Sequence, residues 1–208
     1  MSLRYSLREY QSILVQQIFQ EWTSGRSRRI LLQLPTGAGK TVVFSSIAQQ
    51  FTARKQPVLV LAHREELLLQ AKEKLERVTD EPVGLIKAGY SEQRSRLVQV
   101  ASIASLINRK LPPAALVVVD EAHHSTAATY SQLLEEFPNA YILGVTATPA
   151  RIDGQGFKDL YDSLILGPSV RELIDRGYLS PFKLFAAPKT VDTTGLKKTG
   201  GDYNPKQL

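Results

Sequence analysis

The most constraining feature of the sequence is a glycine-rich turn at residues 34–41, between an apolar run and a helix-like segment. Residues 30–32 are typical of a buried strand, and apolar side chains recur at helical spacing over residues 42–51. Glycines in such a turn let backbone N–H groups approach phosphate oxygens, and the helix N-terminus adds donors and a favourable dipole. The pattern predicts a phosphate-binding turn, with a turn that holds no ligand as the alternative.

Two side chains at the end of this turn suit a nucleoside triphosphate. Lys40 is placed to contact the β- and γ-phosphates, and Thr41 to offer its hydroxyl to Mg²⁺. The generic pattern has glycine at position 34, where this chain has Leu34. The residues expected to bind the nucleotide are Pro35, Thr36, Gly37, Ala38, Gly39, Lys40 and Thr41.

Composition narrows the class of protein. The 208 residues suffice for one domain with a sizeable core, and 43% hydrophobic and 22% charged residues are ordinary for a globular protein. The absence of cysteine excludes disulfides and thiolate metal sites, and the three histidines lack a zinc-binding spacing. No apolar run is long enough for a membrane span, and the polar start is not a secretory signal, so we expect a cytoplasmic protein. The net charge of +6 suits nucleic acid but is also common in proteins that bind none.

Strand-like and helix-like segments alternate along the chain, which predicts an α/β fold with a mainly parallel sheet. Residues 115–119 are continuously apolar and β-branched, as in a strand buried on both faces. The expected strands cover residues 30–32, 57–62, 83–86, 97–101, 115–119, 140–145 and 182–186. The expected helices cover about residues 7–22, 42–51, 64–78, 103–108, 130–137 and 170–176.

A second acidic motif completes the predicted nucleotide site. Asp120 and Glu121 directly follow the apolar run at 115–119, where a parallel sheet places ligand groups in the crevice beside the phosphate turn. A carboxylate at Asp120 can hold Mg²⁺, directly or through water. Glu121 can orient or deprotonate the water that attacks the γ-phosphate. The alternative is an acidic turn that caps the following helix.

Three segments together resemble a superfamily 2 DEAH-type helicase: residues 35–41, the Asp-Glu-Ala-His at 120–123, and the Thr-Ala-Thr-Pro at 146–149. The sequence is most similar to the group that contains XPB-like and type III restriction motor proteins, whose members also carry a second histidine after the tetrapeptide and a continuation like residues 147–154. The resemblance runs from about residue 7 to the C-terminus. It implies a RecA-like P-loop NTPase domain, a three-layer α/β/α fold with a mainly parallel central sheet. Such helicases commonly lack the first glycine.

The resemblance assigns residues on both sides of the phosphate turn. It implies that Gln11, supported by Arg8, reads the adenine edge, with an exposed polar pair on the first helix as the alternative. It implies that Thr146 and Thr148 link the γ-phosphate site to closure driven by nucleic acid, although threonines here can also cap a turn. His123 resembles the histidine that contacts this third motif or the opposing domain.

Two further positions resemble nucleic-acid contacts of the family. Arg64 lies where a loop and helix start contact a strand's phosphates, which suits a guanidinium beside a helix N-terminus. Ser102 matches a hydroxyl position in a later motif, although Ala104 stands where relatives often carry glutamine. Ordinary loops at the sheet edge are the alternative for both segments.

The family motor has two RecA-like domains, and its arginine fingers come from the second. The sequence therefore suggests a first, ATP-binding domain over residues 1–187 and a connection to a second RecA-like domain over residues 188–208. We expect this chain, a monomer, to bind ATP and Mg²⁺ but to hydrolyse ATP slowly and not to unwind duplexes, because an arginine finger contributes about 10³–10⁵ in turnover.

The function implied for the whole protein is that of an ATP-dependent helicase or translocase acting on nucleic acid, with DNA favoured and RNA possible. One alternative is a motor of a restriction or remodelling complex that translocates without separating strands. Another is a nucleotide-gated nucleic-acid-binding module with little turnover.

Overall fold

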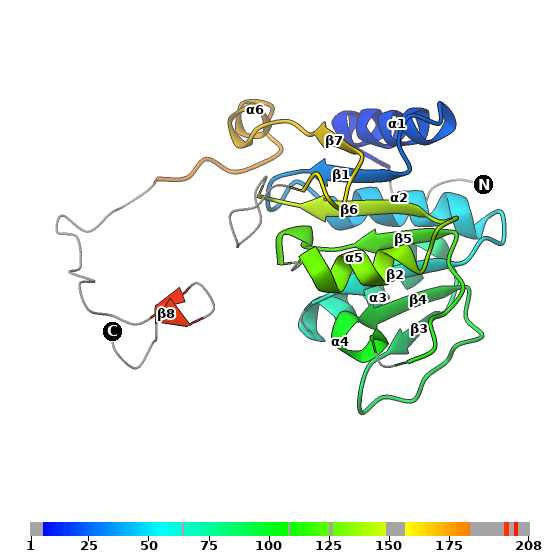
Figure 1. The fold of residues 1–208 in the computed structure, drawn as a ribbon. Helices are drawn as coiled ribbons and strands as arrows, with labels where there is room; N and C mark the ends of the chain where they lie inside the picture. Colours follow the sequence, from blue (N-terminus) through cyan, green and yellow to red (C-terminus); the bar gives the residue numbers. More distant parts are fainter. Residues whose placement is uncertain are drawn as a thin grey trace.

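The computed structural model describes residues 6–63, 65–107, 109–124, 127–148, 157–183, 198–199 and 202–203. Seven strands in this part of the chain form one sheet in the order β3-β4-β2-β5-β6-β1-β7, and every neighbouring pair is parallel. Figure 1 shows the sheet with helices on both of its faces. The α/β fold with a mainly parallel sheet is confirmed.

The strands are short, as is usual for this kind of sheet. They are β1 (Arg29–Gln33), β2 (Val58–Ala62), β3 (Val83–Ile86), β4 (Val98–Ser102), β5 (Leu116–Val119), β6 (Tyr141–Thr146) and β7 (Ser163–Leu166). The helices are α1 (Glu9–Thr23), α2 (Lys40–Thr52), α3 (Glu65–Thr79), α4 (Ile103–Leu106), α5 (Ala127–Glu135) and α6 (Val170–Asp175), with a 3₁₀ turn η1 (Ala122–His124). A separate hairpin is formed by β8 (Lys198–Thr199) and β9 (Asp202–Tyr203).

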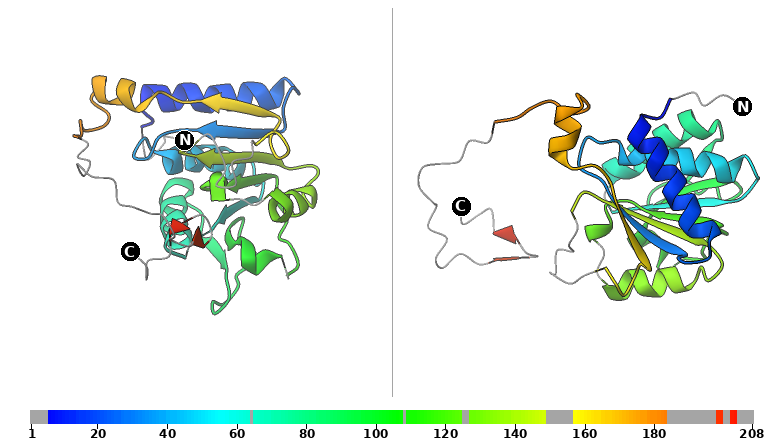
Figure 2. Two further views of the ribbon diagram at one scale, coloured as in Figure 1. Left: turned by 60° about the vertical axis from the view of Figure 1, so that its left-hand side comes forward. Right: turned by 90° about the horizontal axis from the view of Figure 1, so that it is seen from above.

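The helices cover the two faces of the sheet with separate cores. One core contains apolar side chains of α1, α2 and α3, among them Ile18 and Phe44, packed on one face. The other contains side chains of α4 and α5, among them Leu106 and Leu134, packed on the opposite face. The view from above in Figure 2 shows α1 and α5 on opposite sides of the strands. None of the helices in the described part of the chain has the length and apolar character needed to span a bilayer.

The two-sided cover explains the composition of the inner strands. Every residue of β2 and of β5 is buried, because each strand has neighbours on both edges and helices on both faces. A strand in that position must be apolar at every residue and not at alternate residues. The continuous run at 115–119 in the sequence is therefore confirmed as a strand buried on both faces.

The edge strand β7 was not expected from the sequence. Its side chains alternate between half-buried and exposed, and Leu164 and Leu166 are exposed, so its four residues carry little of the pattern of a buried strand. Asp162 holds it beside β1, since its carboxylate accepts from the backbone N–H groups of Arg28 and Arg29, each at 2.8 Å. The expected strand at 182–186 is wrong at residues 182–183, which have no regular structure; residues 184–186 lie outside the described part.

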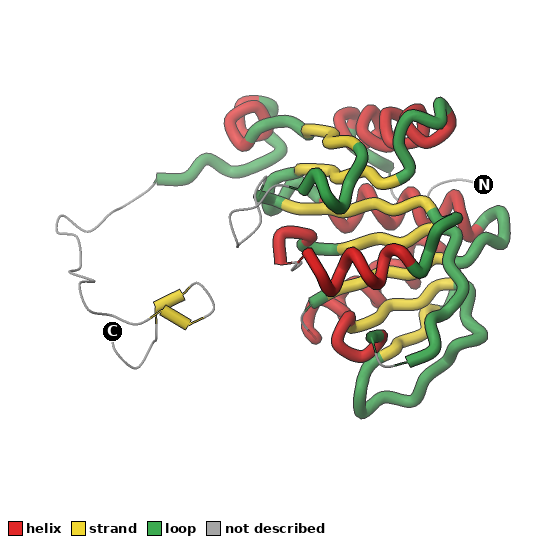
Figure 3. The backbone as a smooth tube through the Cα atoms, viewed as in Figure 1, coloured by secondary structure: helices red, strands yellow, loops and turns green. Residues whose placement is uncertain are grey.

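The strand order brings three predicted motifs to one edge of the sheet. The phosphate turn follows β1, the acidic motif follows β5, and the third motif ends β6, which lies between them. Because all three strands are parallel, their carboxyl ends lie at the same edge. Figure 3 shows the segments after β1 and β5 at the edge near which α6 lies.

Close packing of β6 gives a first test of the fold. A Cβ atom added at Gly144 would lie 2.4 Å from the ring of buried Tyr161. We expect Gly144→Ala to lower the free energy of unfolding by about 1–3 kcal/mol, as overpacking does in well-packed cores, measured by urea denaturation. In a Tyr161→Ala background the same substitution should cost little. Equal losses in both backgrounds would contradict this account of the packing.

Candidate active site

The phosphate turn has the backbone that its glycines permit. Gly37 and Gly39 have φ angles of +80° and +86°, a left-handed conformation that side chains disfavour. Gly39 caps α2, and its carbonyl accepts from the N–H groups of Val42 and Val43. Leu34 is fully buried in the core beside α1, so this position contributes apolar packing where the generic motif has glycine.

The acidic motif meets the turn through a lysine–glutamate pair. Lys40 Nζ lies 3.6 Å from Glu121 Oε1, and only 9% of the Lys40 side chain is exposed. Glu121 has φ +49°, and its N–H donates to Asp120 Oδ1 at 3.0 Å. This left-handed backbone turns two adjacent carboxylates to the same site. The structure therefore brings together Lys40, Asp120 and Glu121.

The third motif joins the same group through a histidine. His123 Nδ1 lies 3.1 Å from Thr146 Oγ1 and 3.3 Å from Glu121 Oε2. The Thr146 hydroxyl donates to the Thr148 carbonyl at 2.9 Å and accepts from the Thr148 N–H at 3.2 Å. Because its hydrogen is used in that way, the Thr146 oxygen can only accept from His123, which favours the tautomer with a proton on Nδ1.

Thr41 and Asp120 share a cavity, as expected for two groups that hold one metal ion. The cavity has a volume of about 280 Å³, and its other lining residues all belong to α3, among them Leu67, Gln70 and Lys74. A hydroxyl oxygen and a carboxylate are the ligand types that Mg²⁺ takes beside nucleotide phosphates. The residues present therefore fit Mg²⁺ bound with a nucleotide.

Burial is the main influence on the charge of Asp120. With 7% of the residue exposed, desolvation raises the pKa of Asp120 from 3.8 to about 6, and the neighbouring charge of Glu121 acts in the same direction. The N–H of Glu121 and the ammonium of Lys40 act in the opposite direction. A buried carboxylate with few compensating charges is what a cation would stabilise.

The start of α1 packs against the other side of the turn. Gln11 is only 3% exposed, its Nε2 donates to the Ala38 carbonyl at 3.1 Å, and its Oε1 accepts from the Arg8 N–H at 3.0 Å. Tyr10 also donates its hydroxyl to the Ala38 carbonyl, at 2.7 Å. Gln11 is thus a buried partner of the turn and not an exposed polar side chain. Sequence reasoning missed Tyr10, whose place in the apolar stripe of the helix indicates only core packing.

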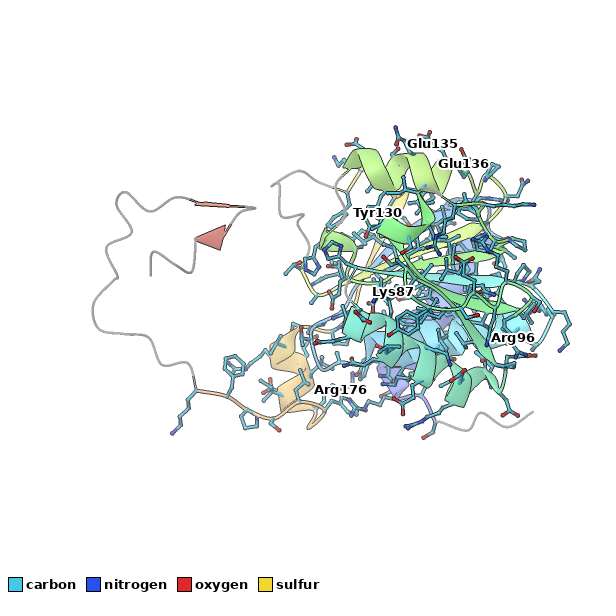
Figure 4. All side chains as sticks on the ribbon, turned by 90° about the horizontal axis from the view of Figure 1, so that it is seen from below. Lys87, Arg96, Tyr130, Glu135, Glu136 and Arg176 are labelled. Atoms are coloured by element: carbon cyan, nitrogen blue, oxygen red, sulfur yellow. The ribbon has the colours of Figure 1, made fainter. Side chains whose placement is uncertain are left out.

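Ser102, one of the two predicted nucleic-acid positions, lies at the same edge of the sheet as the phosphate turn. Ser102 ends β4 and precedes α4, whereas Arg64 and residues 149–154 lie outside the described part of the chain. A nearby ionic group was not expected: Lys87 Nζ lies 2.6 Å from Glu65, which also accepts from the Tyr90 hydroxyl at 2.9 Å. In Figure 4, Lys87 lies toward the end of the sheet where Arg176 is labelled, and Arg96 toward the opposite end.

Residues 4–151 match the protein family described as "Type III restriction enzyme, res subunit". The chain belongs to this family. It is 34% identical over 180 residues to the "51.5 kDa protein" of a Lactococcus phage, covering 86% of this chain and 37% of that protein. It is 30% identical over 216 residues to "Putative ATP-dependent helicase IRC3" of Saccharomyces cerevisiae, covering 95% of this chain and 31% of that protein. It is 32% identical over 190 residues to "DNA 3'-5' translocase XPB2" of Sulfurisphaera tokodaii, covering 87% of this chain and 40% of that protein.

Solved structures show the same architecture. The Pyrococcus furiosus Hef helicase domain aligns with a TM-score of 0.64 at 24% identity, covering 80% of this chain and 39% of that one. The bacteriophage T4 UvsW helicase aligns with a TM-score of 0.65 at 17% identity, covering 79% and 62%. The fold is that of RecA-like helicase domains, and the superfamily 2 resemblance is confirmed. The chain spans about a third to two fifths of the length of the curated relatives named above.

The buried charge of Asp120 predicts a cost in stability. Because the pKa of Asp120 is about 6 in the fold and 3.8 ordinarily, the folded protein binds the proton more tightly. Ionisation therefore destabilises the fold progressively from pH 3.8 to about 6 and fully above pH 6. Without metal or nucleotide, Asp120→Asn should therefore raise the free energy of unfolding by about 1–3 kcal/mol at pH 7.5.

This gain should shrink as the pH falls and vanish near pH 4, where the native carboxyl is already neutral; urea denaturation at several pH values measures it. The control is Asp175→Asn, which removes an exposed carboxylate paired with Arg171 and should change stability little at any pH. A gain from Asp120→Asn that is the same at pH 4 and pH 7.5 would contradict the role of the buried charge.

Proposed function

We propose that this chain is the ATP-binding domain of an ATP-dependent DNA helicase or translocase, which couples ATP hydrolysis to movement on nucleic acid. The observation that carries the proposal is a continuous set of contacts from Lys40 through Glu121 and His123 to Thr146. A phosphate-binding turn alone would indicate only a nucleotide binder. Its connection to an acidic pair and then to a third motif is what a motor needs to sense the γ-phosphate.

Each residue has a role that follows from its position. Lys40 and the N–H groups of the turn bind the β- and γ-phosphates, while Thr41 and Asp120 hold Mg²⁺. When bound, Mg²⁺ neutralises the charge that develops on the phosphate oxygens. Glu121 orients the attacking water and accepts its proton, and Lys40 Nζ lies 3.6 Å from its carboxylate, between the acidic motif and the phosphate turn.

His123 and Thr146 are suited to transmit the state of the site. His123 Nδ1 lies 3.3 Å from Glu121 Oε2 and 3.1 Å from Thr146 Oγ1. A movement of the Glu121 carboxylate would therefore change which of these two oxygens accepts the hydrogen bond from Nδ1–H. Thr146 is buried and tied to the Thr148 backbone, and such a change therefore reaches the loop after β6. In the proposed motor this loop responds when nucleic acid closes the site.

DNA is the favoured track. A relative is named a DNA translocase. The type ISP restriction enzyme LlaGI, which has a similar fold (TM-score 0.62), was solved with a DNA substrate mimic. Translocation without strand separation is the second candidate, because restriction-enzyme subunits are also among the relatives. The alternatives are a motor that moves on RNA and a nucleotide-gated nucleic-acid-binding module with little turnover.

The isolated chain should bind ATP–Mg²⁺ and turn it over slowly. The proposed arginine fingers would come from a second RecA-like domain and contribute about 10³–10⁵ in turnover. We expect micromolar-range binding of a fluorescent ATP analogue, lost in Lys40→Ala and retained in the exposed control Lys55→Ala. Steady-state hydrolysis at a rate typical of complete helicases, about 1 s⁻¹ or more, would contradict the proposed dependence on another domain.

Substitution of the predicted base separates a motor from a switch in the full-length protein. Glu121→Gln should retain ATP binding and reduce hydrolysis by at least about 10²-fold, since it removes the group that accepts the proton of water. A nucleotide-gated switch would instead keep its function in this variant. Strand-displacement and triplex-displacement assays on DNA and on RNA then distinguish unwinding from translocation and identify the track.

A further inference from the structure

The chain returns to the nucleotide site after α6, in a segment that no motif marks. Gly177, with φ +72°, ends the helix and reverses the chain. The N–H groups of Tyr178 and Leu179 then both donate to the Leu173 carbonyl, at 2.8 and 3.1 Å. The segment is therefore fixed on α6 by its backbone, which gives its side chains defined positions.

Leu179 packs against the phosphate turn. A Cβ atom at Gly37 would lie 3.1 Å from Leu179 Cδ2, which is tighter than an ordinary van der Waals contact, so the leucine lies directly against the turn. Leu179 and Tyr178 are both partly buried against the core that contains α1 and α2. The Tyr178 ring also meets the Tyr10 ring edge to face, with centroids 5.1 Å apart, and Tyr10 holds the Ala38 carbonyl.

Tyr178 also holds Arg8. The Arg8 guanidinium lies 5.0 Å from the centroid of the Tyr178 ring, and its Nη1 donates to the Tyr178 carbonyl at 3.4 Å. Arg176 lies 5.3 Å from the same centroid but pairs with the Glu9 carboxylate at 2.7 Å. In these contacts the charge of Arg176 is balanced by a carboxylate, whereas Arg8 contacts the Tyr178 ring, the Tyr178 carbonyl and, at 3.4 Å, the Tyr10 hydroxyl, which are all neutral.

We propose that Tyr178 and Leu179 are positioning residues of the nucleotide site, Tyr178 by holding Arg8 for the base and Leu179 by supporting the turn at Gly37. This inference rests on the proposed function, because it takes ATP as the ligand. A planar guanidinium stacks on aromatic rings and can present its other face to a nucleobase. Fixing Arg8 on Tyr178 before binding reduces the entropy lost when the base arrives.

The contact of Tyr178 with Arg8 and that of Leu179 with Gly37 predict different losses of binding affinity when they are removed. Two ligands can distinguish these losses. ATP has a base and a triphosphate, whereas inorganic tripolyphosphate has only the phosphate part. Tyr178→Leu keeps an apolar side chain beside Tyr10 but removes the ring under Arg8. It should weaken ATP binding by the 208-residue chain about 5–10-fold and change tripolyphosphate binding less than about twofold, measured by calorimetry with Mg²⁺.

Matched variants complete the test. Tyr178→Phe keeps the ring and should bind both ligands as the wild type does. Phe182→Leu is the control, because Phe182 lies in the same segment but is 69% exposed. Leu179→Ala should weaken both ligands together, since it removes the support of the turn. If Tyr178→Leu lowers the melting temperature below the assay range, Arg8→Ala replaces it and should show the same loss confined to ATP.

Four outcomes would each overturn one of the claims. ATP binding by Tyr178→Leu equal to that of the wild type, or an equal loss for ATP and tripolyphosphate, overturns the role of Tyr178 at the base. Unchanged binding of both ligands by a folded Leu179→Ala variant overturns the role of Leu179. Failure of the folded wild-type chain to bind either ligand overturns the proposed function itself.

Discussion

At the carboxyl end of the sheet, the N–H of Leu34 donates to the Thr146 carbonyl at 2.9 Å, continuing the pairing of Gln33 with Thr146. This bond joins the last residue of β6 to the first residue of the phosphate turn. A shift of one residue between β1 and β6 would turn every side chain of one strand to the opposite face and separate the turn from Thr146. The register is maintained by the buried cores on both faces, so the geometry of the site depends on packing far from it.

Residues of the candidate site lower the free energy of unfolding, and packing of the two hydrophobic cores compensates for that loss. Asp120 is a buried carboxylate whose pKa is raised, and Glu121 has a left-handed backbone that costs about 1–2 kcal/mol for a residue with a side chain. Both features belong to adjacent carboxylates whose charge would be offset by a cation bound together with a nucleotide. They are consistent with a domain that is completed by its ligand, because binding to the folded state alone adds to its stability.

Sequence motifs predicted the centre of the site better than its margins. Asp120 and the turn that contains Lys40 follow buried strands, and Thr146 ends the strand between them, so the parallel topology brings the three to one edge of the sheet. Tyr10 was missed because an aromatic in an apolar helical stripe gives the same pattern whether or not its hydroxyl binds a carbonyl. The strand β7 was missed because an edge strand of four residues is half exposed and lacks the pattern of a buried strand.

The segment after α6 was missed for a further reason. Its contacts join residues that lie near opposite ends of the domain in the sequence. Arg8 and Tyr178 are separated by 170 positions, and nothing local in either segment indicates the other. Their contact follows from the placement of β7 beside β1, which carries α6 back over the start of α1. The same path leads the chain from the nucleotide site to the residues after α6. Leu179, in the same segment, thereby lies against the turn at Gly37.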